Sequence, residues 1–419
     1  MSNQGKFMVS LTNEELMTIL QPQFEKDLIV ESYSVTYATQ PGENYGSTML
    51  ALEVTICQTD KSPKETLHIV AKAAPPTEFL QEAFDIRNTF CKEMNIYKLV
   101  GPEIIKFQIE SGFKNEDILD VLPKFYGART TLTGDQDLHA DTNAVLLLEN
   151  LKTSGYKLAD RRSGLDLKHC ELVILKLAQF HALPIALKHK KPNVYKQTVL
   201  KATADYNMGG ENGNPNDALN DLLDSLEKNI PEVAPYLTRI RENGVKYSEI
   251  SNKSLNKEPF ATIVHNDFWT NNMMFCYDSA GDNSQPISVK FVDFQVTLLC
   301  SPVKDIIFFL FSSGSTRVKK DFYEHLIQLY YETFTSTLTK MGCDVNVFSY
   351  EKFKEEVEEF APTQFLHILF MIYVIYAEKQ SAKNLSDVND IDSIMQKPSD
   401  LCKVKILEHI QEFERRGWF

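Results

Sequence analysis

The stretch His265-Asn-Asp-Phe-Trp-Thr-Asn-Asn-Met-Met-Phe275 decides how the rest of this sequence is interpreted. A strand-like segment, Phe260–Val264, leads into it, and a second one ends soon afterwards at Asp293. Asp267 and Asn272 lie five positions apart. That spacing suits a loop with a proton acceptor and an oxygen ligand for Mg²⁺, with Asp293 as a second ligand on the next strand. Phosphoryl transfer needs such parts, because its transition state depends on positioning and charge neutralisation.

Each of these residues also has an ordinary structural interpretation. Asp267 alone is more simply a turn or capping residue, Asn272 an Asx-turn, and Asp293 a strand-end carboxylate. The three together at this spacing favour the chemical interpretation. We therefore predict that Asp267 is a general base within reach of a substrate hydroxyl, and that Asn272 and Asp293 hold Mg²⁺ against nucleotide phosphates.

Two histidines and one further carboxylate accompany this stretch. His265 and His181 are expected to be structural, since a lone histidine is more often packed than catalytic. Asp305 lies twelve positions after Asp293, at the start of a predicted helix. We expect Asp305 to cap that helix or to brace the loop at residues 265–272, with no chemical role.

The first 148 residues predict a small α+β lobe. Five segments have strand composition, and one long segment has apolar residues at helical spacing. The strands are expected at 28–37, 49–57, 67–73, 122–126 and 144–148, and the helix at 77–100. The first strands form an antiparallel meander, and an earlier short helix is expected at 13–20, capped by Thr12 or Asn13.

Lys72 lies in an otherwise apolar strand, where a lysine is rarely buried without a partner. Glu93 follows 21 residues later on the predicted long helix. We predict that Lys72 reaches nucleotide phosphates while Glu93 holds it in place. The alternative is a lysine that extends from an edge strand into solvent.

Two short segments are candidates for nucleotide contacts through the backbone. The connection Pro41–Ser47 could cover phosphates, although it lacks the Gly-x-Gly-x-x-Gly pattern and a plain hairpin is the alternative. The candidate residues in this connection are Gly42, Asn44, Gly46 and Ser47. The hinge-like segment Glu149-Asn150-Leu151 could offer backbone groups to an adenine edge, but any turn would look similar.

The rest of the chain, residues 149–419, predicts a mainly helical lobe. Helices are expected at 167–183, 216–229, 234–243, 303–312, 317–341, 349–378 and 399–416, with Pro362 as a kink or break. Residues 380–398 are expected to form a surface loop. Aromatic residues in these helices are either plain core or the wall of an acceptor pocket. They are Phe308, Phe309, Tyr330, Phe365, Phe370 and Tyr373.

Composition narrows the class of protein. The chain of 419 residues has a formal net charge of −13 and a pI of about 5.3, which argues against a general nucleic-acid binder. Seven cysteines stand singly with no Cys-x-x-Cys pair, as in a reduced cytosolic protein. No secretory signal is visible, and the most apolar run, 365–377, is shorter than a membrane helix needs. We expect a cytoplasmic monomer with no membrane or nucleic-acid partner.

Taken together, the motifs resemble the ecdysteroid kinase-like family, in the choline/aminoglycoside kinase-like branch of the protein-kinase-like fold. The resemblance rests first on His265-x-Asp-x-Trp-x-x-Asn272 and Val292-Asp-Phe-Gln295. Further matches are Gly42–Ser47, Ile69–Lys72, Phe90–Glu93 with Tyr97, Leu148–Leu151, Ala159–Arg162 and Ala178–His181. Two positions depart from the common pattern, Gln295 where protein kinases have Gly and Asn150 where Asp is commoner.

The resemblance implies a bilobal fold and ATP-dependent phosphorylation of a hydroxyl on a small molecule. Asp267 would be the base, Asn272 and Asp293 the Mg²⁺ ligands, and Lys72 with Glu93 the phosphate anchor. The segment Glu149–Leu151 would hold adenine. The family implies a lipophilic acceptor, such as an ecdysteroid or a foreign alcohol, while the sequence leaves steroid, glycoside and other alcohols open.

Two other classes of function stay open. A non-catalytic protein could keep this scaffold and bind a lipophilic ligand. A protein kinase is disfavoured, because the sequence has no Ala-Pro-Glu and no His-Arg-Asp, and only nine residues separate Gln295 from Asp305. That interval leaves no room for a long activation loop.

Overall fold

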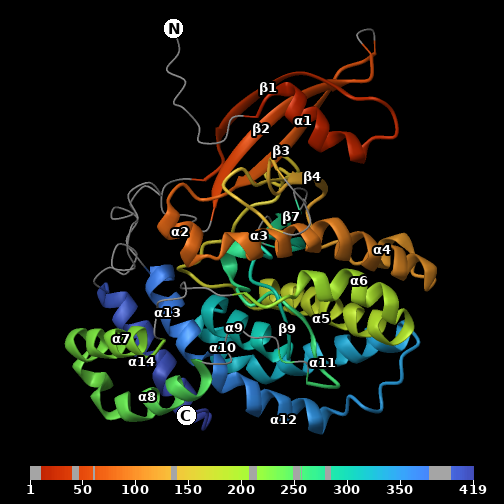
Figure 1. The fold of residues 1–419 in the computed structure, drawn as a ribbon. Helices are drawn as coiled ribbons and strands as arrows, with labels where there is room; N and C mark the ends of the chain where they lie inside the picture. The colour runs from red at the N-terminus through yellow and green to blue at the C-terminus, as the bar shows by residue number, and fades with distance from the viewer. Residues whose placement is uncertain are drawn as a thin grey trace.

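The computed structural model describes residues 11–39, 47–59, 62–133, 139–206, 215–248, 255, 257–278, 285–376 and 398–419. A β-sheet lobe stands above a larger helical lobe, with helices α3 and α4 between them (Figure 1). The predicted α+β architecture, a five-stranded antiparallel sheet plus helices followed by a mainly helical lobe, is confirmed.

The sheet has the strand order β1-β2-β3-β5-β4, with every neighbouring pair antiparallel. The strands are β1 (Ile29–Tyr37), β2 (Thr48–Cys57), β3 (Glu65–Ala73), β4 (Phe125–Arg129) and β5 (Val145–Glu149). On β3 the residue Lys72 pairs with Met49 on one side and Leu146 on the other, so this lysine lies inside the sheet rather than at an edge. The edge-strand alternative for Lys72 is therefore wrong.

The outer face of the sheet is covered by helix α1 (Asn13–Leu20). Its capping box is complete, because Thr12 and Glu15 each accept a hydrogen bond from the other's backbone N–H. Glu15 also pairs with Arg129 on β4 at 2.7 Å. The apolar cluster under α1 is formed by side chains that alternate with the inward-facing ones along β2 and β3.

The long helix expected at 77–100 is interrupted, which corrects that prediction. The chain forms α2 (Glu78–Ala83), then α3 (Ile86–Asn95), a π-helical segment Ile96–Val100, and α4 (Gly101–Glu110). The break lies at Asp85, whose φ of 45° is left-handed and cannot continue a right-handed helix. The helix also runs ten residues past Val100, because Pro102 is tolerated in the first turn of α4.

The helical lobe is built around α5 (Leu167–Lys190), which packs along α11 (Tyr323–Lys340). The remaining helices are α6 (Pro192–Ala202), α7 (Pro215–Asn229), α8 (Leu237–Ser248), α9 (Val303–Ser313), α10 (Thr316–Asp321), α12 (Tyr350–Phe360), α13 (Phe365–Tyr376) and α14 (Asp400–Arg415). Pro362 breaks the segment between α12 and α13, as predicted, while the helix expected at 317–341 is divided at Phe322. No helix was predicted at the position of α6.

Two small two-stranded sheets carry the loops of interest. β6 (Thr262–Val264) pairs with β9 (Leu298–Cys300), and β7 (Met273–Tyr277) pairs with β8 (Pro286–Phe291). The stretch that opens the sequence analysis therefore connects β6 of one sheet to β7 of the other. β5 ends at Glu149, one residue after the predicted lobe boundary, which stays a prediction.

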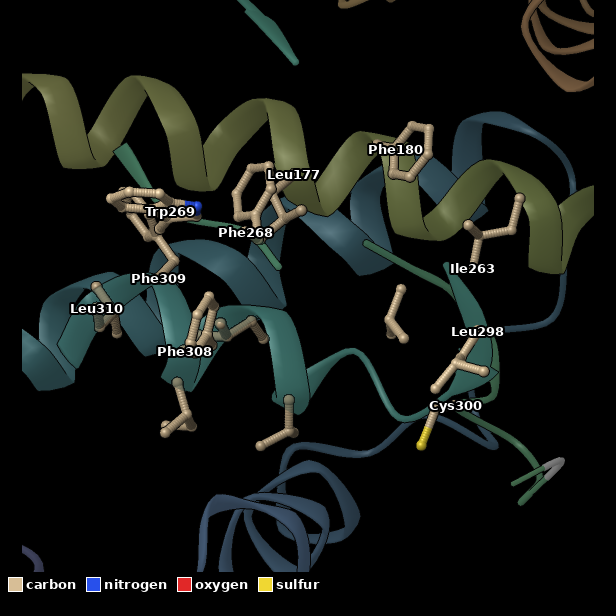
Figure 2. Close-up of a cluster of buried hydrophobic side chains, with 14 of the residues drawn as sticks. Leu177, Phe180, Ile263, Phe268, Trp269, Leu298, Cys300, Phe308, Phe309 and Leu310 are labelled. Carbon is tan, nitrogen blue, oxygen red and sulfur yellow. The ribbon is translucent and has the colours of Figure 1, made fainter. Parts of the chain in front are cut away.

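The core beneath these sheets is continuous and aromatic. Figure 2 shows Phe268 and Trp269 between α5, which carries Leu177 and Phe180, and the helix that carries Phe308 to Leu310. By length and composition two segments of the described chain could span a membrane, Leu167–Lys190 and Tyr350–Tyr376. Their most apolar windows are 72% and 61% buried, as expected for core helices.

Candidate functional site

Lys72, Glu93 and Asp293 form a buried triad of charges between the sheet and the helical lobe. Nζ of Lys72 donates to Oε2 of Glu93 at 2.5 Å and to Oδ1 of Asp293 at 2.6 Å. Lys72 and Glu93 are almost fully buried, and the side chain of Asp293 is 20% exposed. The predicted Lys72–Glu93 ion pair is present, and the lysine is tied to the helical lobe as well.

Asp267 and Asn272 meet at the other end of the same site. Nδ2 of Asn272 donates to the carbonyl oxygen and to Oδ2 of Asp267, each at 2.8 Å. A single turn of 3₁₀ helix, Thr270–Asn272, makes this contact possible, because it reverses the chain just before β7. Since the amide nitrogen is used by Asp267, the amide oxygen of Asn272 is the atom left to face a cation.

Asp293 lies two residues past the end of β8, not on the strand as predicted. The reason is its backbone, which has a φ of 69° and leaves the extended conformation. The N–H of Val292 donates to the carbonyl oxygen of Asn272 at 3.0 Å. The two predicted metal ligands are therefore held beside each other by the main chain.

Asp305 braces the loop, in agreement with one of its two predicted roles. Its oxygens accept from the backbone N–H groups of His265 at 2.6 Å and Asn266 at 2.8 Å. His181 also contacts this carboxylate at 3.2 Å through Nε2 and meets the hydroxyl of Tyr330 through Nδ1. Burial disfavours the charged form of Asp305, but the hydrogen bonds from the two histidines outweigh it and lower the pKa.

The histidines are built into the scaffold. His265 is buried and meets the carbonyl oxygen of Val292 through Nε2 at 2.9 Å, while its ring packs on Phe294. His181 is fully buried. The ring of His265 contacts the backbone after β8, and the ring of His181 contacts the side chains of Asp305 and Tyr330, which fits the structural interpretation of each.

The electrostatics favour a cation at this site. Burial alone would lower the pKa of Lys72, but Asp293 and Glu93 raise it to about 12, so the lysine stays charged. Burial, and next the carboxylate of Asp293, raise the pKa of Asp267 to about 8, while the amide of Asn272 acts against them. A cation held by Asp293 would remove the second cause and favour ionised Asp267.

The residues present fit Mg²⁺. Within the described part of the chain, no group of three His, Cys, Asp or Glu side chains forms a complete metal cage. Mg²⁺ is usually bound through one or two carboxylates together with substrate phosphates. Asp293 and the amide oxygen of Asn272 are donors of that kind, and the chain offers them side by side.

The segments predicted to contact nucleotide through the backbone are only partly described. Gly42, Asn44 and Gly46 lie outside the described residues. Ser47 is buried, and its hydroxyl donates to the sulfur of Met49 at 3.6 Å, so its side chain points into the protein. The prediction for this loop remains untested.

The hinge-like segment is a tight turn directly after β5. The side chain of Glu149 accepts from Ser154 at 2.5 Å, and the N–H of Asn150 donates to His68 on β3 at 3.0 Å. The N–H of Leu151 has no acceptor within the described ranges. Leu151 is thus the residue of the three with a backbone donor to spare for a ligand edge.

The aromatic residues considered for an acceptor pocket belong mostly to the core. Tyr330 stacks on Phe334 and Phe353, and Phe365 stacks on His409. All six residues except Phe370 are buried. These aromatic residues are therefore better interpreted as core, and they do not show where the acceptor binds.

Two residues that support the loop were missed in the sequence. Ser313, at the end of α9, accepts the N–H of Thr270 at 2.9 Å through its hydroxyl. Tyr206, which follows α6, accepts a hydrogen bond from the side chain of Asn266 at 2.9 Å. Neither carries a motif, because each acts through a position that only the folded chain brings to the loop.

Comparison with known proteins gives one family. The model of the ecdysteroid kinase-like family matches residues 41–343, more than half of the chain. A search of curated proteins gave no match.

Solved structures are similar at low identity. A complex of APH(2")-IIia with GDP and kanamycin has 12% identity and a TM-score of 0.39, over 96% of this chain and 97% of that one. A complex of spectinomycin phosphotransferase, APH(9)-Ia, with ADP and spectinomycin has 11% sequence identity and a TM-score of 0.41, and the match covers 98% of this chain and 99% of that one. A choline/ethanolamine kinase family protein from Mesorhizobium loti has 9% sequence identity and a TM-score of 0.37, and the match covers 92% of this chain and 90% of that one.

Proposed function

This chain belongs to the ecdysteroid kinase-like family, and from that premise we propose that it transfers the γ-phosphoryl group of Mg²⁺-ATP to a hydroxyl of a lipophilic small molecule. The acceptor class we propose is an ecdysteroid or a foreign alcohol. The proposal rests on the family and on one observation above all. Lys72 contacts Glu93 and Asp293, and Asp267 contacts Asn272. Asp267 also interacts electrostatically with Asp293, so the two groups lie in one region although they come from separate parts of the sequence.

Each residue has a separate task in this proposal. Lys72 presents a fixed positive charge to the phosphates, and Glu93 keeps its ammonium group from turning away. Asn272 and Asp293 would hold the metal ion, which when bound would neutralise charge on the phosphate oxygens. The burial of the lysine makes its position rigid, which favours catalysis by orientation.

Asp267 orients and accepts the proton of the attacking hydroxyl. The Oδ2 atom of Asp267 accepts a hydrogen bond from Asn272, and the side chain of Trp269 also contacts this carboxylate, so its orientation is fixed. The proton moves from the hydroxyl oxygen to this carboxylate as the new P–O bond forms and the bond from the γ-phosphorus to the ADP oxygen breaks. The products are a phosphate ester and ADP.

A panel assay tests this proposal. Purified protein is incubated with Mg²⁺-ATP and alcohols that include ecdysteroids, plant glycosides and aminoglycosides, and phosphate esters are detected by mass spectrometry. We expect ester formation with a lipophilic alcohol from wild type and none above background from D267N. Ester formation by D267N at the wild-type rate would refute the assignment of the base.

The alternative function is a binding protein on the same scaffold. Thermal unfolding with and without Mg²⁺-ATP separates the two, because a ligand that binds only the native state raises its apparent stability. Stabilisation by Mg²⁺-ATP in wild type, lost in D293N, supports the kinase. No stabilisation in wild type favours the binding protein.

A further inference from the structure

A buried lysine next to Glu93 has no role in the site described above. Lys92 lies on α3 and is 2% exposed. Its Nζ has no hydrogen-bond partner among the described residues. A buried ammonium group without a hydrogen bond is costly, so its position calls for a compensating interaction.

That interaction is with an aromatic ring. Nζ of Lys92 lies 4.0 Å from the centroid of the Tyr206 ring, a distance at which a cation is attracted to the face of the ring. Burial lowers the pKa of Lys92 to about 7, against the opposing charges of Asp205 and Asp85. The contact joins α3 to the segment after α6, and these two helices also pack on each other.

Tyr206 in turn contacts the catalytic loop. Its hydroxyl oxygen accepts the side-chain N–H of Asn266 at 2.9 Å, and Asn266 is the residue directly before Asp267. The backbone of Asn266 is left-handed, with a φ of 63°, so its conformation must be held by its surroundings. Tyr206 is close enough to Asp267 for the two groups to interact electrostatically.

The segment that carries Tyr206 is itself anchored. The carbonyl oxygen of Ala202 accepts a hydrogen bond from Thr297 at 2.7 Å, and that of Lys201 accepts one from Asn95 on α3 at 3.5 Å. Both bonds fix the end of α6 between α3 and the chain that follows Asp293. A shift of α3 would therefore be transmitted to Tyr206.

We propose that Lys92, Tyr206 and Asn266 form a mechanical link that couples the position of α3, and with it the Lys72–Glu93 pair, to the orientation of Asp267. Lys92 and Tyr206 are then positioning residues, since neither touches the reacting atoms. The effect of the link on the reaction rate rests on the proposed phosphoryl transfer. Its effect on the conformation of residues 265–272 does not depend on catalysis.

Two conservative substitutions test the link. Y206F keeps the ring under Lys92 but removes the acceptor for Asn266, and K92M keeps most of the packing but removes the cation. We expect each to lower kcat about five-fold, as the loss of one hydrogen bond or one cation–π contact allows, with KM for ATP unchanged. The double variant should be no slower than either single one, because the residues act in series.

Backbone hydrogen exchange supplies a readout that does not depend on activity. Both variants should speed exchange at residues 265–272 and leave the strands of the main sheet as in wild type. Two matched control variants lie away from the site. Y331F removes the hydrogen bond of 2.9 Å that the Tyr331 hydroxyl donates to the carbonyl oxygen of Phe348, and K354M removes a lysine Nζ 5.2 Å from the centroid of the Tyr350 ring. These controls should change neither kcat nor exchange in the loop.

The outcomes separate the two proposals. If wild type forms no phosphate ester but Y206F and K92M still loosen the loop, the link stands and the proposed function fails. An unchanged Y206F, in rate and in exchange, overturns the link by itself even if K92M folds poorly. Fully additive losses in the double variant overturn it as well.

Discussion

Lys72 and Asp293 lie 221 positions apart in the sequence and are joined by an ion pair of 2.6 Å. Glu93 contacts the same ammonium group at 2.5 Å, so one positive charge faces two carboxylates. Burial, and next the charge of Asp293, raise the pKa of a third carboxyl group nearby, that of Asp267, to about 8. The ammonium group of Lys72 and the carboxylates of Glu93 and Asp293 together leave a net negative charge, which would attract a divalent cation.

D293N tests this balance. The substitution leaves Lys72 paired with Glu93 but removes the charged metal ligand. We expect Mg²⁺-ATP affinity to fall about 10- to 100-fold, the range for one charge-assisted interaction, while binding of ATP in EDTA stays the same. Isothermal titration with and without Mg²⁺ measures both.

The control for D293N is D120N, which removes a carboxylate 2.6 Å from the buried Lys290 outside the site. Its nucleotide affinity should equal that of wild type. An equal loss of affinity in D293N with and without Mg²⁺ would contradict the role of Asp293 as a metal ligand.

D267N tests the base. Asparagine has nearly the same shape and can still accept a hydrogen bond from Asn272, but it cannot take a proton. We expect kcat to fall about 10²- to 10⁴-fold, as for the loss of a general base, with the dissociation constant of Mg²⁺-ATP within about three-fold of wild type. Steady-state kinetics and titration on the same preparation decide it. A raised dissociation constant with unchanged kcat would instead make Asp267 a nucleotide contact.

Local patterns in the sequence predicted most elements and the contacts of Lys72 with Glu93 and of Asp267 with Asn272. Strand composition predicted the five strands, although the fourth was expected at 122–126 and lies at Phe125–Arg129. The spacing of Asp267, Asn272 and Asp293 predicted that these three residues lie near one another. What could not be predicted depends on backbone conformations that side-chain patterns do not report. Asp85, which interrupts the long helix, and Asp293, which lies two residues beyond β8, are left-handed residues of that kind.

Support for the site was also hidden from the sequence. Tyr206 and Ser313 reach the loop at residues 265–272 from the ends of two helices that lie elsewhere in the chain. A tyrosine after a helix and a serine at a helix end are common, so neither residue stands out before the fold is known. The burial of Lys92 could not be predicted either, because it depends on how α3 packs on α6.

G127A tests the contact between β4 and α1. Gly127 has a φ of 150°, and an added Cβ would lie 2.3 Å from the carbonyl oxygen of Ile19. Because this oxygen belongs to the main chain and cannot rotate away, α1 must shift, and we expect a loss of about 3 kcal/mol in the free energy of unfolding. Denaturation in urea, followed by circular dichroism, measures the loss.

Gly112 provides the matched control. It also has a positive φ, of 83°, but an added Cβ would have no heavy atom within 4 Å. G112A should therefore cost only the backbone strain, about 1 kcal/mol. Equal losses in the two variants would show that the approach of α1 to β4 is not tight.

His409 tests the dependence of stability on pH. Its ring is 5% exposed, meets the carbonyl oxygen of Phe365 through Nε2 at 3.0 Å, and leaves Nδ1 without a hydrogen-bond partner among the described residues. Burial lowers the pKa of this histidine from 6.5 to about 3. Between these two values the unfolded chain binds a proton that the folded chain does not, so the free energy of unfolding falls as the pH falls.

The size of this effect follows from the two pKa values. At pH 5 the group should lower the free energy of unfolding by about 2 kcal/mol relative to pH 7.5, and above pH 6.5 it should contribute nothing. H409Q keeps a donor for Phe365 and does not titrate. Urea denaturation of both proteins at pH 7.5 gives the cost of the changed packing, and the same measurement at pH 5 isolates the proton. H409Q should lose about 2 kcal/mol less than wild type between the two pH values, and an equal loss in both would mean that His409 takes up its proton without unfolding.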